Sequence, residues 1–338
     1  MNKIAGTLIL LLLISLLPAC GSPKFYQSQF FAMDTLVEIS LYAESPSRAQ
    51  AAFAAAEAEF RRINDLCDRF AEKNLPDPAK SDVWRINQAG GQAVPVSPDT
   101  LAMVEGALEI GLESGGAFDI TVGKLMDLWD FGGSPHKPGE AELAKALESV
   151  DYSLVRLDKQ AGAVTVPDGM VLDLGGVAKG YATEQAGAML REQGITRAII
   201  NAGGNVLALG HKPDGSLWQV GIRHPRDQGE IAGILQLDNQ AAVTSADSER
   251  FFILEGIRYH HILNPNSGQP ARELASVTIV ADTSFEAELL STAVFVLGRK
   301  GSSSLLAAHP GVGVVYIDLD MQVEATDNIL DTFIGMRN

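Results

Sequence analysis

The sequence predicts an α+β fold built from mixed sheets with flanking helices. Apolar runs of strand type are interspersed with capped helical segments, but without the regular strand–helix alternation that a doubly wound parallel sheet requires. No repeat of roughly 20–50 residues is present, which argues against solenoids and propellers. With 338 residues, 46% of them hydrophobic, the chain is long enough for one large domain or two small ones.

The first 19 residues are typical of a signal peptide that is removed. Lys3 is their only charge, and the almost wholly apolar run 4–17 is too short to span a bilayer, which takes roughly 20 residues. The "LPAC" that ends at Cys20 resembles a bacterial lipobox, in which the cysteine is lipidated. The sequence therefore predicts a lipid anchor on Cys20, a tether over 20–28, a domain over 29–338, and a place in the bacterial cell envelope, facing the periplasm.

Charge and cysteine content narrow the classes of partner. The chain has 26 Lys and Arg against 42 Asp and Glu, a net charge of −16, so phosphate backbones repel it and nucleic acid is not an expected partner. Lipidation of Cys20 leaves Cys67 alone, so no intrachain disulfide is expected. Cys67 falls on a stripe of helical spacing with Phe60 and Ile63, and we interpret it as a buried small apolar residue rather than a catalytic thiol.

The first half of the chain divides into strands and helices by its turn and cap signals. Ser45-Pro46 and Ser97-Pro98 each place a capping residue before a proline suited to the first helical turn. The pattern predicts a strand within 30–43, a helix from Pro46 to about 70, a helix from Pro98 to Glu113, and paired strands within 154–174.

The second half is richer in β-branched runs. A helix is expected from Lys179 and another over 284–298. Strands are expected within 197–210, 218–225, 233–245, 249–256, 275–282 and 311–318.

The stretch "VLDLGGVAKGYATEQA", residues 171–186, is the first candidate for a ligand site. It matches neither the P-loop spacing nor G-x-G-x-x-G. Gly175 and Gly176 nevertheless allow a ligand to approach the backbone, and the following helix directs its positive end outward. Lys179 adds a charge for phosphate, and Asp173 an acceptor for an amino or hydroxyl group. A plain glycine turn with a solvated lysine is the alternative.

Two further clusters contain polar groups in apolar surroundings. Asp119 lies among aromatic residues of core type, so its carboxylate needs a partner, for which a ligand's donor is one candidate. His260 and His261 end a strand before the turn 264–268, and because neighbouring strand residues face opposite ways, only one of them is expected to face a site. This disfavours a zinc pair and favours proton transfer by one imidazole, with a structural histidine as the alternative.

Glu288 and Thr292 stand four residues apart in the last helical segment. They therefore share one helix face and present a carboxylate and a hydroxyl. Oxygen ligands of this kind suit Mg²⁺, which commonly binds one or two carboxylates together with substrate phosphates. The same spacing is also common on solvated helices.

Taken in order, these clusters resemble the ApbE family of FAD:protein FMN transferases. The resemblance runs from about Phe31 to Leu297. The stretches that carry it are "MDT", "SDVWRIN", "AFDITVG", "LDLGGVAKGYA", "NAGGNV", "VGIRHP", "TSADSERFF", "HHILNPNSGQP" and "STAVFVLG". The chain departs from the family pattern at Ala246, Ser248, Asn264 and Glu288, the last of which stands where the family usually has Asp.

The resemblance implies a two-lobed single unit that holds FAD and Mg²⁺. The residues implied to contact FAD are Met33, Ala117, Phe118, Asp119, Asp173, Lys179, His261 and Ile262. The implied metal ligands are the Gly176 carbonyl and the side chains of Glu288 and Thr292. Phe70 is the candidate for the aromatic ring that often covers the flavin or adenine. For catalysis we expect Lys179 to neutralise phosphate charge and His261 to act as the base.

The implied reaction is Mg²⁺-dependent transfer of FMN from FAD to a Ser or Thr hydroxyl of a target protein, with release of AMP. The expected target is a redox subunit exposed to the periplasm. Two alternatives remain open at the level of the sequence. One is an FAD pyrophosphatase that uses water and yields FMN and AMP, and the other is a lipoprotein that binds flavin without catalysis.

Overall fold

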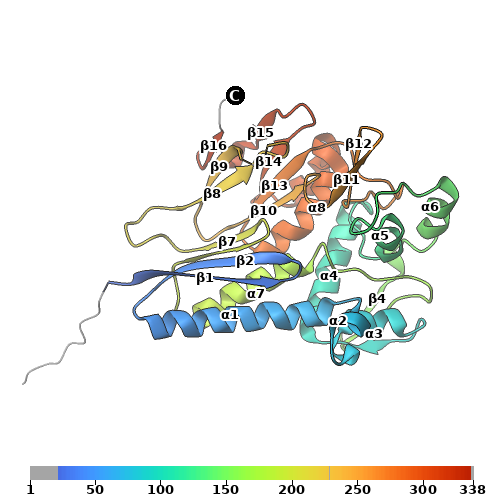
Figure 1. Ribbon diagram of the computed structural model, residues 1–338, viewed down its shortest axis with the longest axis horizontal. Helices are drawn as coiled ribbons and strands as arrows, with labels where there is room; N and C mark the ends of the chain where they lie inside the picture. Colours follow the sequence, from blue (N-terminus) through green and yellow to red (C-terminus); the bar gives the residue numbers. More distant parts are fainter. Residues whose placement is uncertain (1–21, 228, 336–338) are drawn as a thin grey trace, which may run out of the picture.

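The computed structural model describes residues 22–227 and 229–335, and its largest element is an antiparallel eight-stranded sheet (Figure 1). The predicted signal peptide and Cys20 lie outside these residues. The strands, in spatial order, are β1 (Lys24–Ala32), β2 (Thr35–Ala43), β6 (Ala198–Ala202), β7 (Asn205–Leu209), β10 (Ala241–Ala246), β13 (Ser276–Ala281), β14 (Gly313–Ile317) and β15 (Val323–Ala325). β13 is buried at every position, so the middle of the sheet is covered on both faces.

Three long helices cover one face of this sheet, and the short α9 (Ser303–Ala308) follows the last of them. They are α1 (Pro46–Cys67), α7 (Ala178–Glu192) and α8 (Ser284–Gly301). A second sheet of three strands, β8 (Trp218–Arg223), β9 (Ile231–Leu237) and β16 (Phe333–Gly335), packs its Trp218 and Leu235 against Val206 and Val315 on the opposite face. Apolar surface removed from water on both faces stabilises this lobe.

A smaller lobe stands at one end of the large sheet, on the right in Figure 1. Its helices are α2 (Ala71–Asn74), α3 (Asp82–Gln88), α4 (Pro98–Glu113), α5 (Gly123–Trp129) and α6 (Glu140–Leu147). Its small sheet joins β3 (Val94–Pro95), β5 (Ala163–Thr165) and β4 (Arg156–Asp158). Short 3₁₀ turns lie at Pro78–Lys80, Tyr152–Leu154 and Asp327–Ile329. The predicted α+β class with mixed sheets and flanking helices is therefore confirmed.

A separate two-stranded hairpin, β11 (Phe251–Leu254) and β12 (Ile257–His260), packs against the smaller lobe. Phe252 and Tyr259 have ring centroids 5.4 Å apart, and both pack against Trp129 of α5. Aromatic pairs at these separations add to the stabilisation from area burial alone. The hairpin is thereby fixed through one of its two faces.

The helix starts at Pro46 and Pro98 agree with the sequence, because Ser45 and Ser97 each accept a backbone N–H as N-caps. The expected tether over 20–28 is wrong at its end, because β1 begins at Lys24 and pairs with β2 along its whole length. Its Gln-Ser-Gln stretch is polar because β1 is the edge of the sheet. The paired strands expected within 154–174 are limited to β4 and β5, beyond which only an isolated bridge at Val171 forms.

Candidate functional site

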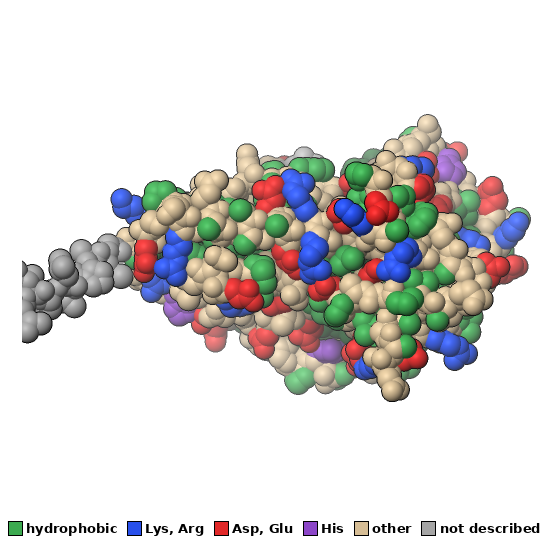
Figure 2. Space-filling model, turned by 90° about the horizontal axis from the view of Figure 1, so that it is seen from below, with side chains coloured by type: hydrophobic (Ala, Val, Ile, Leu, Met, Phe, Trp, Pro, Cys, Tyr) green, Lys and Arg blue, Asp and Glu red, His purple; other side chains and the backbone are tan. Residues whose placement is uncertain are grey.

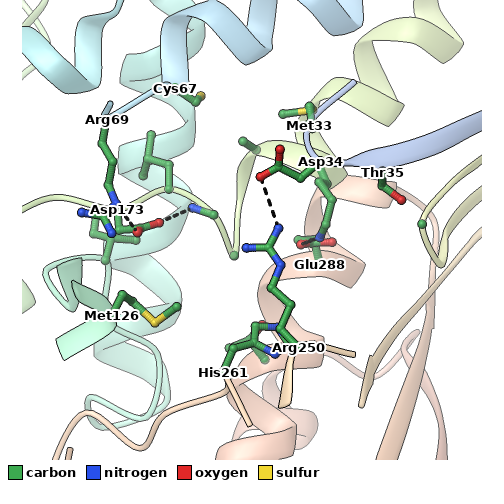
Figure 3. Close-up of a pocket in the computed structure, with 18 of the residues that line it drawn as sticks. Met33, Asp34, Thr35, Cys67, Arg69, Met126, Asp173, Arg250, His261 and Glu288 are labelled. Atoms are coloured by element: carbon green, nitrogen blue, oxygen red, sulfur yellow. Dashed lines mark hydrogen bonds and ion pairs between the residues drawn. The ribbon is translucent and has the colours of Figure 1, made fainter. Parts of the chain in front are cut away.

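A cavity of about 810 Å³ lies where the two lobes meet, and Figure 3 shows part of its lining. Its walls come from segments far apart in the sequence, among them the β1–β2 turn, the end of α1, the loop before α7, the β10 end, the residues after β12, and α8. All the residues predicted to bind FAD or Mg²⁺ line this cavity. They are Met33, Ala117, Phe118, Asp119, Asp173, Gly176, Lys179, His261, Ile262, Glu288 and Thr292. Their contacts with ligands remain predictions.

The β1–β2 turn reaches the cavity with a strained backbone. We expected one strand over 30–43, but the chain reverses at Met33 and Asp34, whose φ angles are 53° and 57°. Positive φ at both central residues is the mark of a type I′ turn, which normally selects Asn or Gly. Neither is present, so no local signal predicted a hairpin here. Left-handed non-glycine residues of this kind concentrate at functional sites.

The loop before α7 holds Asp173 firmly. Its backbone N–H donates to the Ile120 carbonyl at 2.8 Å, and its carboxylate accepts the Gly175 N–H at 2.7 Å. The other carboxylate oxygen forms an ion pair with Arg69 Nε at 2.8 Å. The carboxylate of Asp173 therefore already has two partners within the chain, one of them a cation that faces the same cavity (Figure 3).

Lys179 and Glu288 form the central ion pair of the site. Lys179 Nζ lies 2.8 Å from Glu288 Oε1, and the Glu288 side chain is only 5% exposed. The Asn205 amide donates to the second carboxylate oxygen. Gly180 makes this arrangement possible, because a Cβ at that position would lie 2.4 Å from Glu288 Cβ. An almost buried carboxylate facing a cavity is costly unless paired, and here a lysine and an amide pair it.

The donors predicted for Mg²⁺ are close to one another. Thr292 follows Glu288 by one turn of α8, and its Oγ1 lies 3.8 Å from where a Cβ on Gly176 would be. In the described part of the chain no group of three His, Cys, Asp or Glu side chains is placed to hold a metal, and the predicted donor set contains only one such side chain. A carboxylate, a hydroxyl and a backbone carbonyl around a cavity fit Mg²⁺, which keeps its remaining positions for water and phosphate oxygens.

The two adjacent histidines face opposite ways, as the alternation of strand residues predicts. His260 is buried, with Nε2 2.8 Å from the Ala271 carbonyl oxygen and its ring edge-on to Phe295. His261 lines the cavity, and its Nδ1 has no hydrogen-bond partner among the described residues. Burial, together with the nearby charge of Arg250, lowers the pKa of His261 to about 3. The imidazole is therefore neutral at neutral pH and able to accept a proton.

Asp119 finds its partners within the chain. One carboxylate oxygen accepts the Thr121 N–H and hydroxyl, at 2.7 and 2.6 Å, and the other accepts the Tyr152 N–H at 2.9 Å. Burial raises the pKa of Asp119 despite these hydrogen bonds, which favour its ionised form. The buried acid that the sequence singled out thus fixes the turn that positions Ala117 and Phe118.

Cys67 lines the same cavity and is partly rather than fully buried. Its Sγ lies 3.8 Å from the Met103 sulfur, and burial raises the pKa of the thiol well above its usual range. A thiol in this state is not a nucleophile at neutral pH. The interpretation of Cys67 as a non-catalytic residue is therefore consistent with its surroundings.

Sequence reasoning missed the three arginines of the cavity wall, of which Arg61 pairs with Glu57 on its own helix. Arg69 lies against the ring of Phe70 at 4.1 Å and bridges Asp173 and Asp127. Arg250 reaches across to Asp34 at 3.5 Å, as Figure 3 shows. Nothing local marks Arg69 as a site residue, whereas Arg250 lies inside the quoted stretch "TSADSERFF". Phe70, the candidate for the covering ring, also lines the cavity.

Comparison with known proteins decides the family. A sequence profile of the ApbE family matches residues 33–316, most of the chain. The chain belongs to the ApbE family. Among curated ApbE relatives, the FAD:protein FMN transferase of Treponema pallidum is 33% identical over 335 residues, which cover 93% of this chain and 91% of that protein. One from Klebsiella pneumoniae is 33% identical over 266 residues, covering 77% and 82%.

Solved ApbE structures share the fold. The crystal structure of an ApbE protein from Thermotoga maritima superposes with a TM-score of 0.82 at 30% identity, covering 91% of this chain and 99% of that one. The flavin transferase ApbE of Vibrio cholerae gives 0.80 at 24% identity, with 92% and 99% covered, and at that identity the likeness concerns the fold alone. The arrangement of two lobes around the cavity is thus that of the ApbE family.

Proposed function

We propose that this protein transfers FMN from FAD to a Ser or Thr hydroxyl of a partner protein and releases AMP. The observation that carries the proposal is the convergence of the ApbE-family segments, from Met33 to Thr292, on one cavity of about 810 Å³. This volume lies within the range of about 300–1,000 Å³ that is usual for ligand pockets. The curated relatives named above are FAD:protein FMN transferases, which supports the same reaction for this chain.

Cations of the cavity support the binding of a dinucleotide. Lys179, near the N-terminus of α7, and Arg69, beside Asp173, both face the space. A helix N-terminus and a lysine together favour a diphosphate. Phe70 is 39% exposed on the wall and offers a ring on which a flavin or adenine can stack.

Glu288, Thr292 and the Gly176 carbonyl would hold Mg²⁺. When bound, the ion would neutralise charge on the pyrophosphate of FAD. Lys179 then has a second role, because in its present position it pairs with the Glu288 carboxylate and keeps that buried charge compensated. An incoming phosphate oxygen competes with Glu288 for the same ammonium group, so Lys179 can exchange its contact with Glu288 for a contact with the phosphate.

His261 is the base of the proposed reaction. The acceptor oxygen forms a bond to the phosphorus of the FMN half, the P–O bond to AMP breaks, and the hydroxyl proton passes to the neutral imidazole. The side chain of His261 lines the cavity, where its neutral imidazole would meet this proton. With water in place of the hydroxyl, the same residues would yield FMN and AMP.

For the cellular setting we propose a lipid anchor on Cys20, a position on the periplasmic side of the envelope, and a periplasm-exposed redox subunit as acceptor. The support is the sequence "LPAC" and the apolar run before it. Within residues 22–227 and 229–335, no helix has the length and apolar character needed to cross a bilayer. Radiolabelled palmitate incorporation that disappears in Cys20→Ala tests the anchor.

One mass measurement tests the reaction. The mature protein is incubated with FAD, Mg²⁺ and a soluble redox-subunit domain that carries the acceptor Ser or Thr, and the intact masses are recorded. A gain equal to one FMN on the acceptor supports transfer. Free FMN and AMP without that gain identify a pyrophosphatase, and unchanged FAD bound to the protein identifies a flavin carrier.

Replacement of Glu288 tests the metal site. Glu288→Gln keeps the size of the side chain but removes the charge, so we expect the Mg²⁺-dependent rate to fall by about 100-fold or more. The matched control is Glu286→Gln on the same helix, whose carboxylate contacts His309 rather than the cavity, and which should retain the rate. Full activity of Glu288→Gln would remove this carboxylate from the metal site.

A further inference from the structure

The β11–β12 hairpin grows directly out of the rim of the cavity. Arg250 lines the cavity and is followed at once by β11, while β12 ends at His260 and is followed by His261, which also lines the cavity. Both strands therefore have one end at the site where the acceptor hydroxyl has to arrive. A chain that paired with β11 would therefore have one end at the cavity rim, next to Arg250.

One face of the hairpin is packed, and the other exposes apolar side chains of β11, although His260 opposite Phe251 is buried on it. Phe252 packs on Trp129 and Phe131 of the smaller lobe, so this face is rigid. The opposite face carries Phe251 and Ile253, which are 37% and 58% exposed. Two neighbouring exposed apolar side chains on a rigid strand form a surface that gains free energy when a partner covers it.

Arg258, opposite Ile253 on this second face, adds positive charge. The Arg258 guanidinium lies 3.8 Å from the centre of the Phe251 ring, whereas the Arg272 guanidinium lies 5.2 Å from the centre of the Tyr259 ring on the packed face. Within the described parts of the chain, Arg258 has no carboxylate in ion-pair range, because its Nη1 donates to the Asp247 carbonyl at 3.5 Å and the Asp247 carboxylate is paired with Arg226. In a protein of net charge −16, an arginine without a carboxylate partner beside apolar side chains favours a partner that brings a carboxylate. Figure 2, by contrast, shows a face where acidic and basic side chains are interspersed.

The outer edge of β11 has unpaired backbone groups. The His261 N–H donates to the Arg250 carbonyl at 3.0 Å, so this pair points its backbone groups inward. Because inward and outward pairs alternate along an antiparallel ladder, Phe251 and Ile253 point their N–H and C=O groups outward. The sheet consists of β11 and β12 only, and no other described segment donates to or accepts from these groups.

We propose that an extended segment of the acceptor protein pairs with the outer edge of β11 and so delivers its Ser or Thr hydroxyl to His261. The segment places apolar side chains over Phe251 and Ile253 and a carboxylate near Arg258. Two strand residues span ~7 Å, so the paired stretch ends at the cavity rim. This is strand addition, in which backbone hydrogen bonds supply affinity and alternate side chains supply specificity. The inference rests on the proposed transfer of FMN to a protein.

A proline at the outer edge tests the proposal. Ile253→Pro removes an N–H that points outward and leaves the β11–β12 hydrogen bonds in place, as edge strands tolerate. With the soluble redox-subunit domain as acceptor, we expect kcat/KM to fall at least tenfold, through KM, while the Kd for FAD stays within twofold. Ile253→Thr keeps the N–H and a β-branched side chain, and should lose less than threefold.

A second pair of variants tests the same edge in case the proline variant misfolds. Ile253→Lys should raise KM for the same acceptor, whereas Leu319→Lys, which replaces a similarly exposed leucine (53%) outside the cavity lining, should not. Unchanged kcat/KM in both Ile253→Pro and Ile253→Lys overturns the docking edge while leaving FMN transfer intact. A change confined to oligomeric state in sedimentation velocity assigns the edge to a second copy and also overturns it. Absence of any FMN adduct with the wild-type protein overturns both proposals.

Discussion

The imidazole of His261 is held neutral by its position in the wall of the cavity. Burial disfavours the protonated ring, and Arg250, His260 and Lys179 add unfavourable charge, so the pKa of His261 falls to about 3. A base with so low a pKa is weak, but it is fully in its accepting form at neutral pH. Its efficiency then depends on geometry and on the charges around the phosphate.

We therefore expect the signal of His261 not to titrate between pH 5 and pH 8. Protonation begins only as the pH approaches 3, since a depressed pKa keeps the neutral ring stable above that value. The measurement is a nitrogen–carbon correlated NMR titration of the imidazoles, with the His261 signal assigned by its absence from His261→Asn. A midpoint near 6.5 for that signal would contradict the buried environment. A fall of kcat/KM on the acid side of the pH profile with the same midpoint would contradict it as well.

Residue chemistry was predictable where a local rule linked it to geometry. Strand alternation separated His261 from His260, and the spacing of four placed Glu288 and Thr292 on one face of α8. Arg69 was not predicted because it lies in the site through its ion pair with Asp173, which is more than 100 positions away in the chain. Asp119 was recognised as a buried acid, but its Tyr152 partner is supplied by tertiary structure.

Among the elements, the crossing of α7 and α8 sets the geometry of the site. Gly180 allows the two helices to touch, because a Cβ there would lie 2.4 Å from Glu288 Cβ and 2.6 Å from the Ser284 carbonyl oxygen. Lys179, next to Gly180, can then reach the Glu288 carboxylate. The helices themselves were predictable from their caps and periodicity, but this close approach was not, because glycine inside a helix says nothing of what lies opposite.

Gly180→Ala should destabilise the protein by about 1–3 kcal/mol, because the methyl group has to push a backbone carbonyl and a helix aside. We also expect weaker FAD binding, since Lys179 and Glu288 move with their helices. Urea unfolding and FAD fluorescence titration measure the two effects. Gly301→Ala is the matched control, because a Cβ there meets Leu297 at an ordinary 3.4 Å. Equal stability of Gly180→Ala and the wild type would show that the helices do not need this contact.

At the scale of the whole molecule, the cavity belongs to both lobes. Phe118 and Asp119 come from the smaller lobe, while Glu288 and Thr292 come from α8 on the large sheet. The lobes were foreseeable only through the family resemblance, because neither composition nor periodicity tells which segments pack together. A ligand that bridges the two walls contacts both parts of the fold at once.

Binding of FAD with Mg²⁺ should therefore stabilise both lobes together. At a ligand concentration of about 100 times Kd, linkage predicts a gain of about 2.7 kcal/mol, seen as a rise in the melting temperature of a single transition. Riboflavin, which lacks the phosphates, should give a smaller rise, and chelation of the metal should remove part of the gain with FAD. In Glu288→Gln, only the Mg²⁺-dependent part of the rise in melting temperature should be lost, because Lys179 and Arg69 still face the phosphates. Two separate transitions, of which FAD moves only one, would mean that the ligand does not bridge the lobes as the cavity lining requires.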